Sequence, residues 1–254
     1  MGKQLLETEN WFREKCRECA DIKFRPINLG KYGEIKSLAI YLEVTAENLM
    51  LGESMLGRMI MQLQEMDEEA VLQCIEKNEL GISDVFPLDT KEDGMRALLA
   101  GNMILLIDGL EKILKIGSKG YPAKSISSAE SEKVLRGSNE GFCESVKINT
   151  ALVRKRIRST DLKVKEIFLG ERSDTVVSIL YMEELAYPRM LEELEDRLNT
   201  YAIDGVLDSG ILEQLSEEHW ASPFPQFQTT ERPDLAALEL LEGRVVVLSD
   251  NSPT

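Results

Sequence analysis

Hydrophobic and polar positions follow two periods along the first half of the chain, one typical of strands and one typical of helices. The strands predicted from short apolar runs are 37–42, 103–107 and 112–116, and the helices predicted from a spacing of three to four are 46–63, 67–80 and 91–100. Asp108 and Gly109 separate the last two apolar runs and predict a hairpin turn. Residues 1–35 are charged and follow neither period, so we expect loop or frayed helix there.

The second half contains the clearest amphipathic helix, predicted over 142–157. Phe142, Val146, Val153 and Ile157 fall on one side of it, with acidic residues near its start and basic residues at its end, as the helix dipole favours. The other predicted helices are 189–200 and 209–215, and the predicted strands are 164–169, 175–181, 203–207 and 244–249. A strand, a helix and a strand in succession predict a βαβ unit.

Chain length and one linker-like stretch predict two domains. A chain of 254 residues has about the length of two ordinary domains. Residues 117–131 are the richest in Gly, Pro and Ser, and they predict a linker between an amino-terminal α/β subdomain, 1–122, and a second α/β subdomain, 123–254. We therefore expect a mixed α/β (α+β) fold. Because 244–249 has a strand pattern and only a turn follows it, we expect the natural protein to continue.

The charge balance argues against nucleic acid as a partner. Lys and Arg number 30 against 45 Asp and Glu, which gives a net charge of −15, and such a chain repels a polyanion. One local cationic stretch lies within 147–165, where seven basic residues stand against Asp161. The simple explanation is compensation of a helix end and a solvated face. The functional alternative is docking to an acidic partner surface or to anionic lipid headgroups.

The residues that catalysis or metal binding would need are scarce. The single histidine, His219, and four cysteines cannot form a zinc site of usual spacing, and Cys16 and Cys19 lie in a charged stretch that does not suit thioredoxin-like chemistry. Neither a nucleophile motif nor a glycine-rich nucleotide loop occurs. We therefore expect that the chain is not an enzyme and that it binds neither a cofactor nor a metal ion. No export signal and no apolar run long enough to span a membrane occurs, so we expect this part of the protein to be soluble.

Six segments together resemble a known receptor family. They are RGSNEGF at 136–142 with the following Glu144, 149–156, 170–175, SPFPQ at 222–226, TERPD at 230–234 and LEGRV at 241–245. In these segments the chain resembles the A subunit of spore germinant receptors, the GerA family. The resemblance is specific from about residue 90 onward. It departs from the family pattern at Ser138, Asn139 and Leu235, where basic residues or proline are frequent.

The resemblance implies a function in spore germination. The chain would be the amino-terminal region of an A subunit that precedes the first membrane span, in the spore inner membrane and on the cytoplasmic or core side. Its implied partners are the B and C subunits, a further copy of itself, and a nutrient such as an amino acid, sugar or nucleoside. Two subdomains separated by a cleft would resemble the substrate-binding proteins of transporters, with the nutrient bound in the cleft.

The family motifs also supply candidate site residues. Those predicted to bind a ligand are Arg136, Glu140, Glu144, Asn149, Glu231, Arg232 and Asp234, and those predicted to contact a partner are Arg154, Lys155, Arg156 and Arg158. An amino-acid ligand would need facing cationic and anionic groups, which Arg232 with Glu231 or Asp234, or Arg136 with Glu140, could supply. One alternative is that the charged residues form a buried ion-pair and hydrogen-bond network with a purely structural role. Another is that the chain is an assembly module that binds no ligand and docks the B and C subunits.

Overall fold

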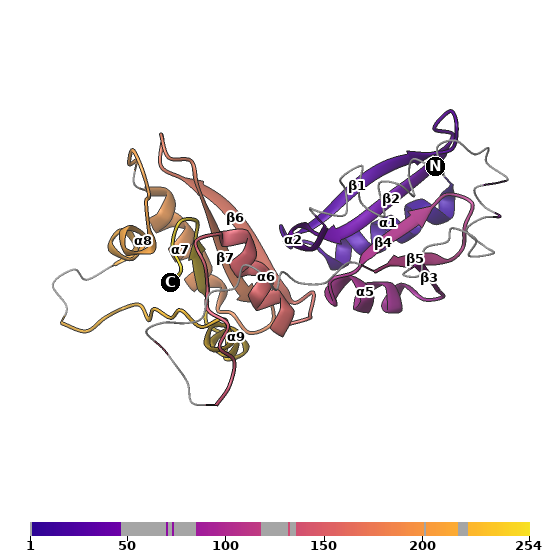
Figure 1. Ribbon diagram of the computed structural model, residues 1–254. Helices are drawn as coiled ribbons and strands as arrows, with labels where there is room; N and C mark the ends of the chain where they lie inside the picture. The colour runs from indigo at the N-terminus through magenta and orange to yellow at the C-terminus, as the bar shows by residue number, and fades with distance from the viewer. Residues whose placement is uncertain are drawn as a thin grey trace. The chain divides into compact units, whose positions relative to one another are not determined.

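The computed structural model describes residues 2–46, 70, 73, 85–117, 132, 136–200, 202–217 and 223–254 (Figure 1). The chain divides into two compact units. Unit 1 comprises Met1–Arg17 and Asp21–Tyr121, and unit 2 comprises Glu18–Ala20 and Pro122–Thr254. The helices predicted over 46–63 and 67–80 and most of the predicted linker lie outside the described residues, apart from the helical residues 70 and 73. None of the helices in the described ranges is long and apolar enough to cross a membrane.

Unit 1 is built on an antiparallel sheet of five strands in the order β1-β2-β4-β5-β3. The strands are β1 (Ile22–Leu29), β2 (Ile35–Leu42), β3 (Val85–Leu88), β4 (Met103–Ile107) and β5 (Ile113–Ile116), and the helices are α1 (Lys3–Lys15), α2 (Glu43–Ala46) and α5 (Lys91–Leu99). The predicted β4–β5 hairpin is confirmed, and Gly109 in its turn has a φ of 86°. The predicted helix at 91–100 is confirmed as α5, whose first turn Thr90 caps by accepting from the Asp93 amide.

The expectation of loop or frayed helix over residues 1–35 agrees with a helix at α1 but missed the strand β1. Helix α1 buries only Leu5 and Phe12 in an otherwise charged sequence, so its apolar period is too sparse to stand out. Strand β1 is an edge strand that carries Pro26 and two basic residues, which is typical of sheet edges and weakens the strand pattern.

Unit 2 has three layers around an antiparallel sheet of three strands in the order β6-β7-β8 (Figure 1). The strands are β6 (Leu162–Leu169), β7 (Thr175–Met182) and β8 (Val246–Ser249), and the helices are α6 (Val146–Arg156), α7 (Pro188–Thr200), α8 (Ser209–Ser216) and α9 (Pro233–Leu241). Leu162, Val164 and Leu180 point to one face and pack with residues of α6 and α9. Leu169, Val177 and Ile179 point to the other face and pack with α7 and α8. Alternation along two strands thus builds two separate cores.

Two predictions for unit 2 are wrong. Every strand pair of the described sheets is antiparallel, so no βαβ unit exists there. Residues 203–207 are not a strand, because the β6–β7 turn satisfies their backbone groups. The amide of Glu171 donates to the Ile203 carbonyl at 2.8 Å, and the Val206 amide donates to Ser173 Oγ at 3.1 Å. The helix predicted from Phe142 begins at Val146. The predicted resemblance of the whole fold to transporter substrate-binding proteins is not confirmed.

Candidate functional site

Most of the sequence candidates gather where the end of α6 lies near the start of α9, two helices that pack against each other in unit 2. We call this group the α6–α9 network. Its members are Glu132, Ser138, Glu140, Lys155, Arg156, Thr230, Glu231, Arg232 and Asp234. They come from three stretches that are far apart in the sequence, so only the fold brings them together.

Glu140 is the centre of the first arm of the network. Lys155 Nζ donates to its Oε1 at 2.6 Å, and Arg156 Nη2 donates to its Oε2 at 2.8 Å. Arg156 Nη2 also lies 3.0 Å from Ser138 Oγ, which it uses as a second acceptor. Partial burial alone would raise the pKa of Glu140, but the hydrogen bonds and charges of Lys155 and Arg156 outweigh it and lower the pKa below its ordinary value. The carboxylate therefore stays ionised at neutral pH.

Arg232 and Asp234 form the second arm. Arg232 Nε and Nη2 donate to the two carboxylate oxygens of Asp234 at 3.2 and 2.6 Å, a bidentate pair. Arg232 is the N-cap residue of α9, Pro233 opens the helix, and Asp234 lies in its first turn, where the helix dipole favours an anion. The hydrogen bond from Arg232 lowers the pKa of Asp234, partial burial opposes this, and the positive charge of Arg156 adds to the lowering. The two arms therefore lie within electrostatic range of each other.

Glu132 connects the network to the segment that precedes α9. Its Oε2 accepts from Thr230 Oγ1 at 2.7 Å and from the Glu231 amide at 2.8 Å. The Glu231 carbonyl in turn accepts from the Phe142 amide at 2.8 Å. Two connecting segments of unit 2 are thus joined side by side, one ahead of α6 and one ahead of α9.

Asn149 and Arg154 lie in the interior of unit 2. The amide side chain of Asn149 accepts from the Cys143 amide at 2.8 Å, so it fixes the backbone ahead of α6. Arg154 is fully buried, and its guanidinium donates to the carbonyls of Ser159 at 2.6 Å and Leu162 at 2.9 Å. We predicted that Arg154 contacts a partner, but a side chain with no exposed surface cannot do so. Its role is to hold the turn between α6 and β6.

Arg136, Glu144 and Arg158 are exposed. Arg136 makes no hydrogen bond or ion pair with the part of the chain that the structure describes. The Glu144 carbonyl accepts from the Asn251 amide at 2.7 Å, while its side chain is at the surface. Arg158 Nε donates to the Lys155 carbonyl at 3.3 Å. These three side chains therefore remain accessible to a partner, unlike the paired members of the α6–α9 network.

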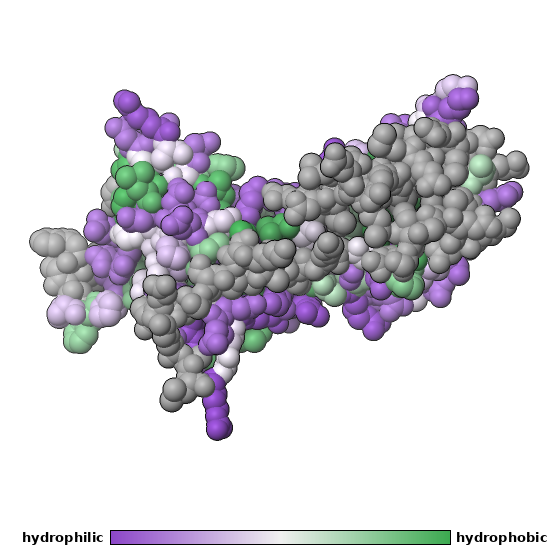
Figure 2. Space-filling view, in the orientation of Figure 1, coloured by the Kyte–Doolittle hydropathy of each residue, from purple (hydrophilic) through white to green (hydrophobic). Residues whose placement is uncertain are grey.

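The pairing limits what the α6–α9 network can do chemically. Two of the three carboxylates that we predicted to meet a ligand's ammonium group, Glu140 and Asp234, already accept from a cation of the same unit. A ligand would have to displace these partners, so the geometry agrees with the structural alternative. No group of three potential metal ligands occurs among the described residues. The coloured residues on the face that Figure 2 shows are mostly hydrophilic, with a few hydrophobic ones among them.

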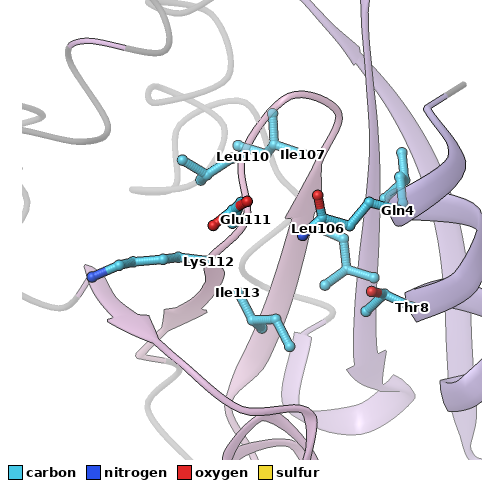
Figure 3. A pocket seen from close by; sticks show the side chains of 9 residues that line it. Gln4, Thr8, Leu106, Ile107, Leu110, Glu111, Lys112 and Ile113 are labelled. Atoms are coloured by element: carbon cyan, nitrogen blue, oxygen red, sulfur yellow. The ribbon is translucent and has the colours of Figure 1, made fainter.

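Unit 1 has a pocket between α1 and the β4–β5 hairpin, with about 240 Å³ of empty space that is partly open to solvent (Figure 3). Apolar side chains of the sheet line it, together with Gln4 and Thr8 from α1 and Glu111 from the hairpin. Lys112 extends away from α1 and pairs with Asp89 at 3.4 Å. Its cavity volume is only about 20 Å³, whereas ligand sites usually have about 300–1,000 Å³, so this pocket is small. None of the residues predicted from the sequence lines it.

Sequence reasoning missed Glu132, Ser138 and Thr230. Ser138 was noticed only as a departure from the family pattern, yet its hydroxyl accepts from the Glu140 amide at 3.3 Å as well as from Arg156. A usable signal existed, since Ser and Thr two residues ahead of another polar residue are typical of turns in which the hydroxyl binds the backbone. Glu132 carried no such signal, because its partners are about 100 residues away in the sequence.

Comparison with known proteins identifies relatives over almost the whole chain. A family model described as Bacillus/Clostridium GerA spore germination protein matches residues 10–254. The uncharacterized membrane protein YfkQ of Bacillus subtilis is 37% identical over 238 residues, which cover 92% of this chain and 45% of YfkQ. Spore germination protein KA of Bacillus subtilis is 27% identical over 253 residues, which cover 100% of this chain and 46% of that protein. The chain thus spans less than half the length of these relatives.

A solved structure is similar over both units. The crystal structure of the N-terminal domain of the A subunit of the Bacillus megaterium spore germinant receptor GerK3 superposes with a TM-score of 0.71 at 26% sequence identity. The match covers 98% of this chain and 92% of that domain. Because the match covers 98% of the chain, the structural similarity also includes unit 1, where the sequence motifs of the family were not specific.

Proposed function

The chain belongs to the GerA family of Bacillus/Clostridium spore germination proteins, and from this premise we propose that it is the amino-terminal receptor domain of a larger A subunit that triggers spore germination in response to a nutrient. The observation that carries the proposal is the likeness of both units to the GerK3 A-subunit domain, over 98% of the chain. In this proposal the full protein lies in the spore inner membrane, with this domain on the core side.

The first form of the proposal is direct binding of a small nutrient by this domain. An amino acid, sugar or nucleoside would be the ligand. Thermal unfolding against a panel of these compounds at millimolar concentration tests it. A ligand at 100 times its dissociation constant adds about 2.7 kcal/mol to the free energy of unfolding, which for a chain of this size is a shift of several degrees. A shift confined to one chemical class is expected, and no shift across the panel contradicts direct binding.

A second candidate function is favoured by the pairing of the α6–α9 network. Because Glu140, Arg232 and Asp234 bind one another or their neighbours, they hold unit 2 in one conformation and need no ligand to be satisfied. In this alternative the domain is an assembly module that docks the B and C subunits, and the nutrient is captured elsewhere in the complex. The exposed Arg158 and the 36% exposed side chain of Lys155 then lie on the docking face.

Charge reversal of Arg158 tests the second candidate in the full-length receptor. Arg158→Glu is expected to reduce co-purification of the B and C subunits without lowering the melting temperature of the domain, because its one hydrogen bond is long and exposed. Arg189→Glu is a matched control, since Arg189 is also exposed and lies on α7, on the other side of the sheet. Equal recovery of the subunits with both variants would remove the support for a docking face at Arg158.

A further inference from the structure

Three residues of the amino-terminal segment belong to unit 2 although the chain on both sides of them belongs to unit 1. Glu18–Ala20 run parallel to the start of β6 and form a bridge in which Cys19 is the partner of Val164. The Val164 amide donates to the Glu18 carbonyl at 2.8 Å, and the Ala20 amide donates to the Val164 carbonyl at 2.9 Å. Since β7 occupies the other side of β6, these two bonds close the outer edge of the sheet at Val164.

Side chains strengthen this contact from both ends. The Cys19 side chain is buried, and its thiol lies 3.6 Å from the Leu162 carbonyl and 3.8 Å from the Thr160 carbonyl. The Tyr181 hydroxyl donates to Glu18 Oε2 at 2.9 Å. Burial of Tyr181, together with the hydrogen bond to Glu18, raises the pKa of its phenol, so it remains a donor at physiological pH.

Arg154 stabilises the part of unit 2 that Glu18–Ala20 contacts. Its guanidinium binds the carbonyls of Ser159 and Leu162, so it fixes the turn whose carbonyls also meet the Cys19 thiol. The docking surface on β6 is therefore built by unit 2 itself. The amino-terminal segment adds only three residues to this surface, and its backbone contacts with β6 include the bridge and the two hydrogen bonds at Val164.

Two features make this docking easier to open than the rest of the sheet. Glu18 has a φ of 57°, a backbone conformation that residues other than glycine adopt only at a cost. Strand pairs with few hydrogen bonds at the edge of a sheet open locally before the centre does. By contrast, β7 is paired on both sides, and Ile179 at its centre is fully buried.

We propose that Glu18–Ala20 is a strap that covers the outer edge of β6. The strap detaches from β6 by local opening, while the β6-β7-β8 sheet stays folded. The inference is independent of the proposed function, because it rests only on contacts within unit 2. When the strap opens, the amide and carbonyl of Val164 become available to another extended chain, as at any free sheet edge.

Hydrogen exchange of the whole 254-residue chain tests the strap directly. In the parent protein the Val164 amide is expected to exchange at least tenfold faster than the Ile179 amide, after correction for intrinsic rates, because strap opening exposes only the former. Ala20→Pro removes the amide that donates to Val164, and it is expected to speed exchange at Val164 by a further tenfold or so while exchange at Ile179 stays unchanged. Ala20→Ser keeps the amide and is the matched control.

A second variant covers the case in which proline disturbs the fold. Tyr181→Phe removes only the hydroxyl that donates to Glu18, and it is expected to speed exchange at Val164 about two- to tenfold. Tyr187→Phe, at an exposed tyrosine in the same unit, is its control. The proposal is overturned if Val164 and Ile179 exchange at the same rate in the parent protein and rise together in the variants, because the strap would then open only with the sheet.

Discussion

Replacing Arg154 by alanine is expected to destabilise unit 2 by about 3–5 kcal/mol. The magnitude follows from the two hydrogen bonds that the fully buried guanidinium donates, to the Ser159 and Leu162 carbonyls at 2.6 and 2.9 Å. Hydrogen bonds of charged groups contribute about 1.5–3 kcal/mol each, and alanine leaves both carbonyls without this donor. Because both bonds come from one guanidinium they are not fully additive, so we expect a total of about 3–5 kcal/mol. The loss of the long side chain adds a cavity to a packed region between α6 and β6.

Urea and thermal unfolding followed by circular dichroism measure this loss. With about 2–4 °C for each kcal/mol in a chain of 150–250 residues, the melting temperature should fall by roughly 6–20 °C. Arg154→Lys should lie between the parent and Arg154→Ala, because an ammonium keeps the charge but not the fork that reaches two carbonyls. Arg158→Ala is the control, and its long, exposed hydrogen bond predicts a change within about 0.5 kcal/mol. Equal losses for Arg154→Ala and Arg158→Ala would refute the reasoning.

Two further substitutions test the network and the β6–β7 turn. Glu140→Gln should cost about 1 kcal/mol at pH 7, because the ion pairs with Lys155 and Arg156 are lost. Since the pKa of Glu140 is lower in the folded state, its contribution is present above the ordinary glutamate pKa of about 4.3 and is lost as the pH falls through the folded value, so unfolding of the variant should depend less on pH in that acid window. Gly170→Ala should cost about 2 kcal/mol or more in urea unfolding, because Gly170 has a φ of 88° and the new Cβ would lie 2.3 Å from Ser173 Oγ.

Both of these predictions have outcomes that contradict them. If Glu140→Gln leaves the acid unfolding curve of the domain unchanged, the two ion pairs contribute nothing measurable. Gly210→Ala is the control for the turn, because Gly210 lies in α8 without a positive φ and its new Cβ would meet only Asp208 Oδ1, at 3.3 Å. It should be neutral or stabilising by up to about 1 kcal/mol. A similar loss for both glycine variants would show that the turn geometry is not the cause.

The sequence predicted elements where one period dominated. Strands β6 and β7 and the β4–β5 hairpin were found because their apolar runs end at turn residues. Helix α7 was found from Leu191, Leu194 and Leu198, which do pack on the second core of unit 2. Helix α9 was missed because its apolar residues lie all around it and the TERPD segment ahead of it was treated only as a motif. Residues 203–207 were mistaken for a strand because Ile203 and Val206 pack on the second core of unit 2, although Leu207 is 68% exposed and the backbone bonds with the β6–β7 turn and not with a strand.

The sequence identified many of the charged residues of the candidate site, but it did not predict which of them pair with one another. A run of basic residues at the end of a helix was expected to form one face, yet successive helical residues point about 100° apart. Arg154 lies four residues after Thr150 and three before Ile157, both buried, so the helical period itself places it on the inner side. That signal was present in the sequence and was outweighed by the local charge. The partners of Glu132 and Glu140 could not be predicted, because the pairings depend on how α6 and α9 pack.

Several charged residues of the family motifs are members of the α6–α9 network. The segments at 136–142 and 149–156 are far in the sequence from the segment at 230–234. Ion pairs join Glu140 to Lys155 and Arg156, and Arg232 to Asp234, while the Phe142 amide and Glu132 bind the backbone at Glu231. Such a network can stabilise the fold without any ligand, since removing one partner leaves the other charge without its counterpart. A loss of germination in an Arg232 or Glu140 variant therefore identifies a nutrient contact only when the unfolding free energy of the same variant is unchanged.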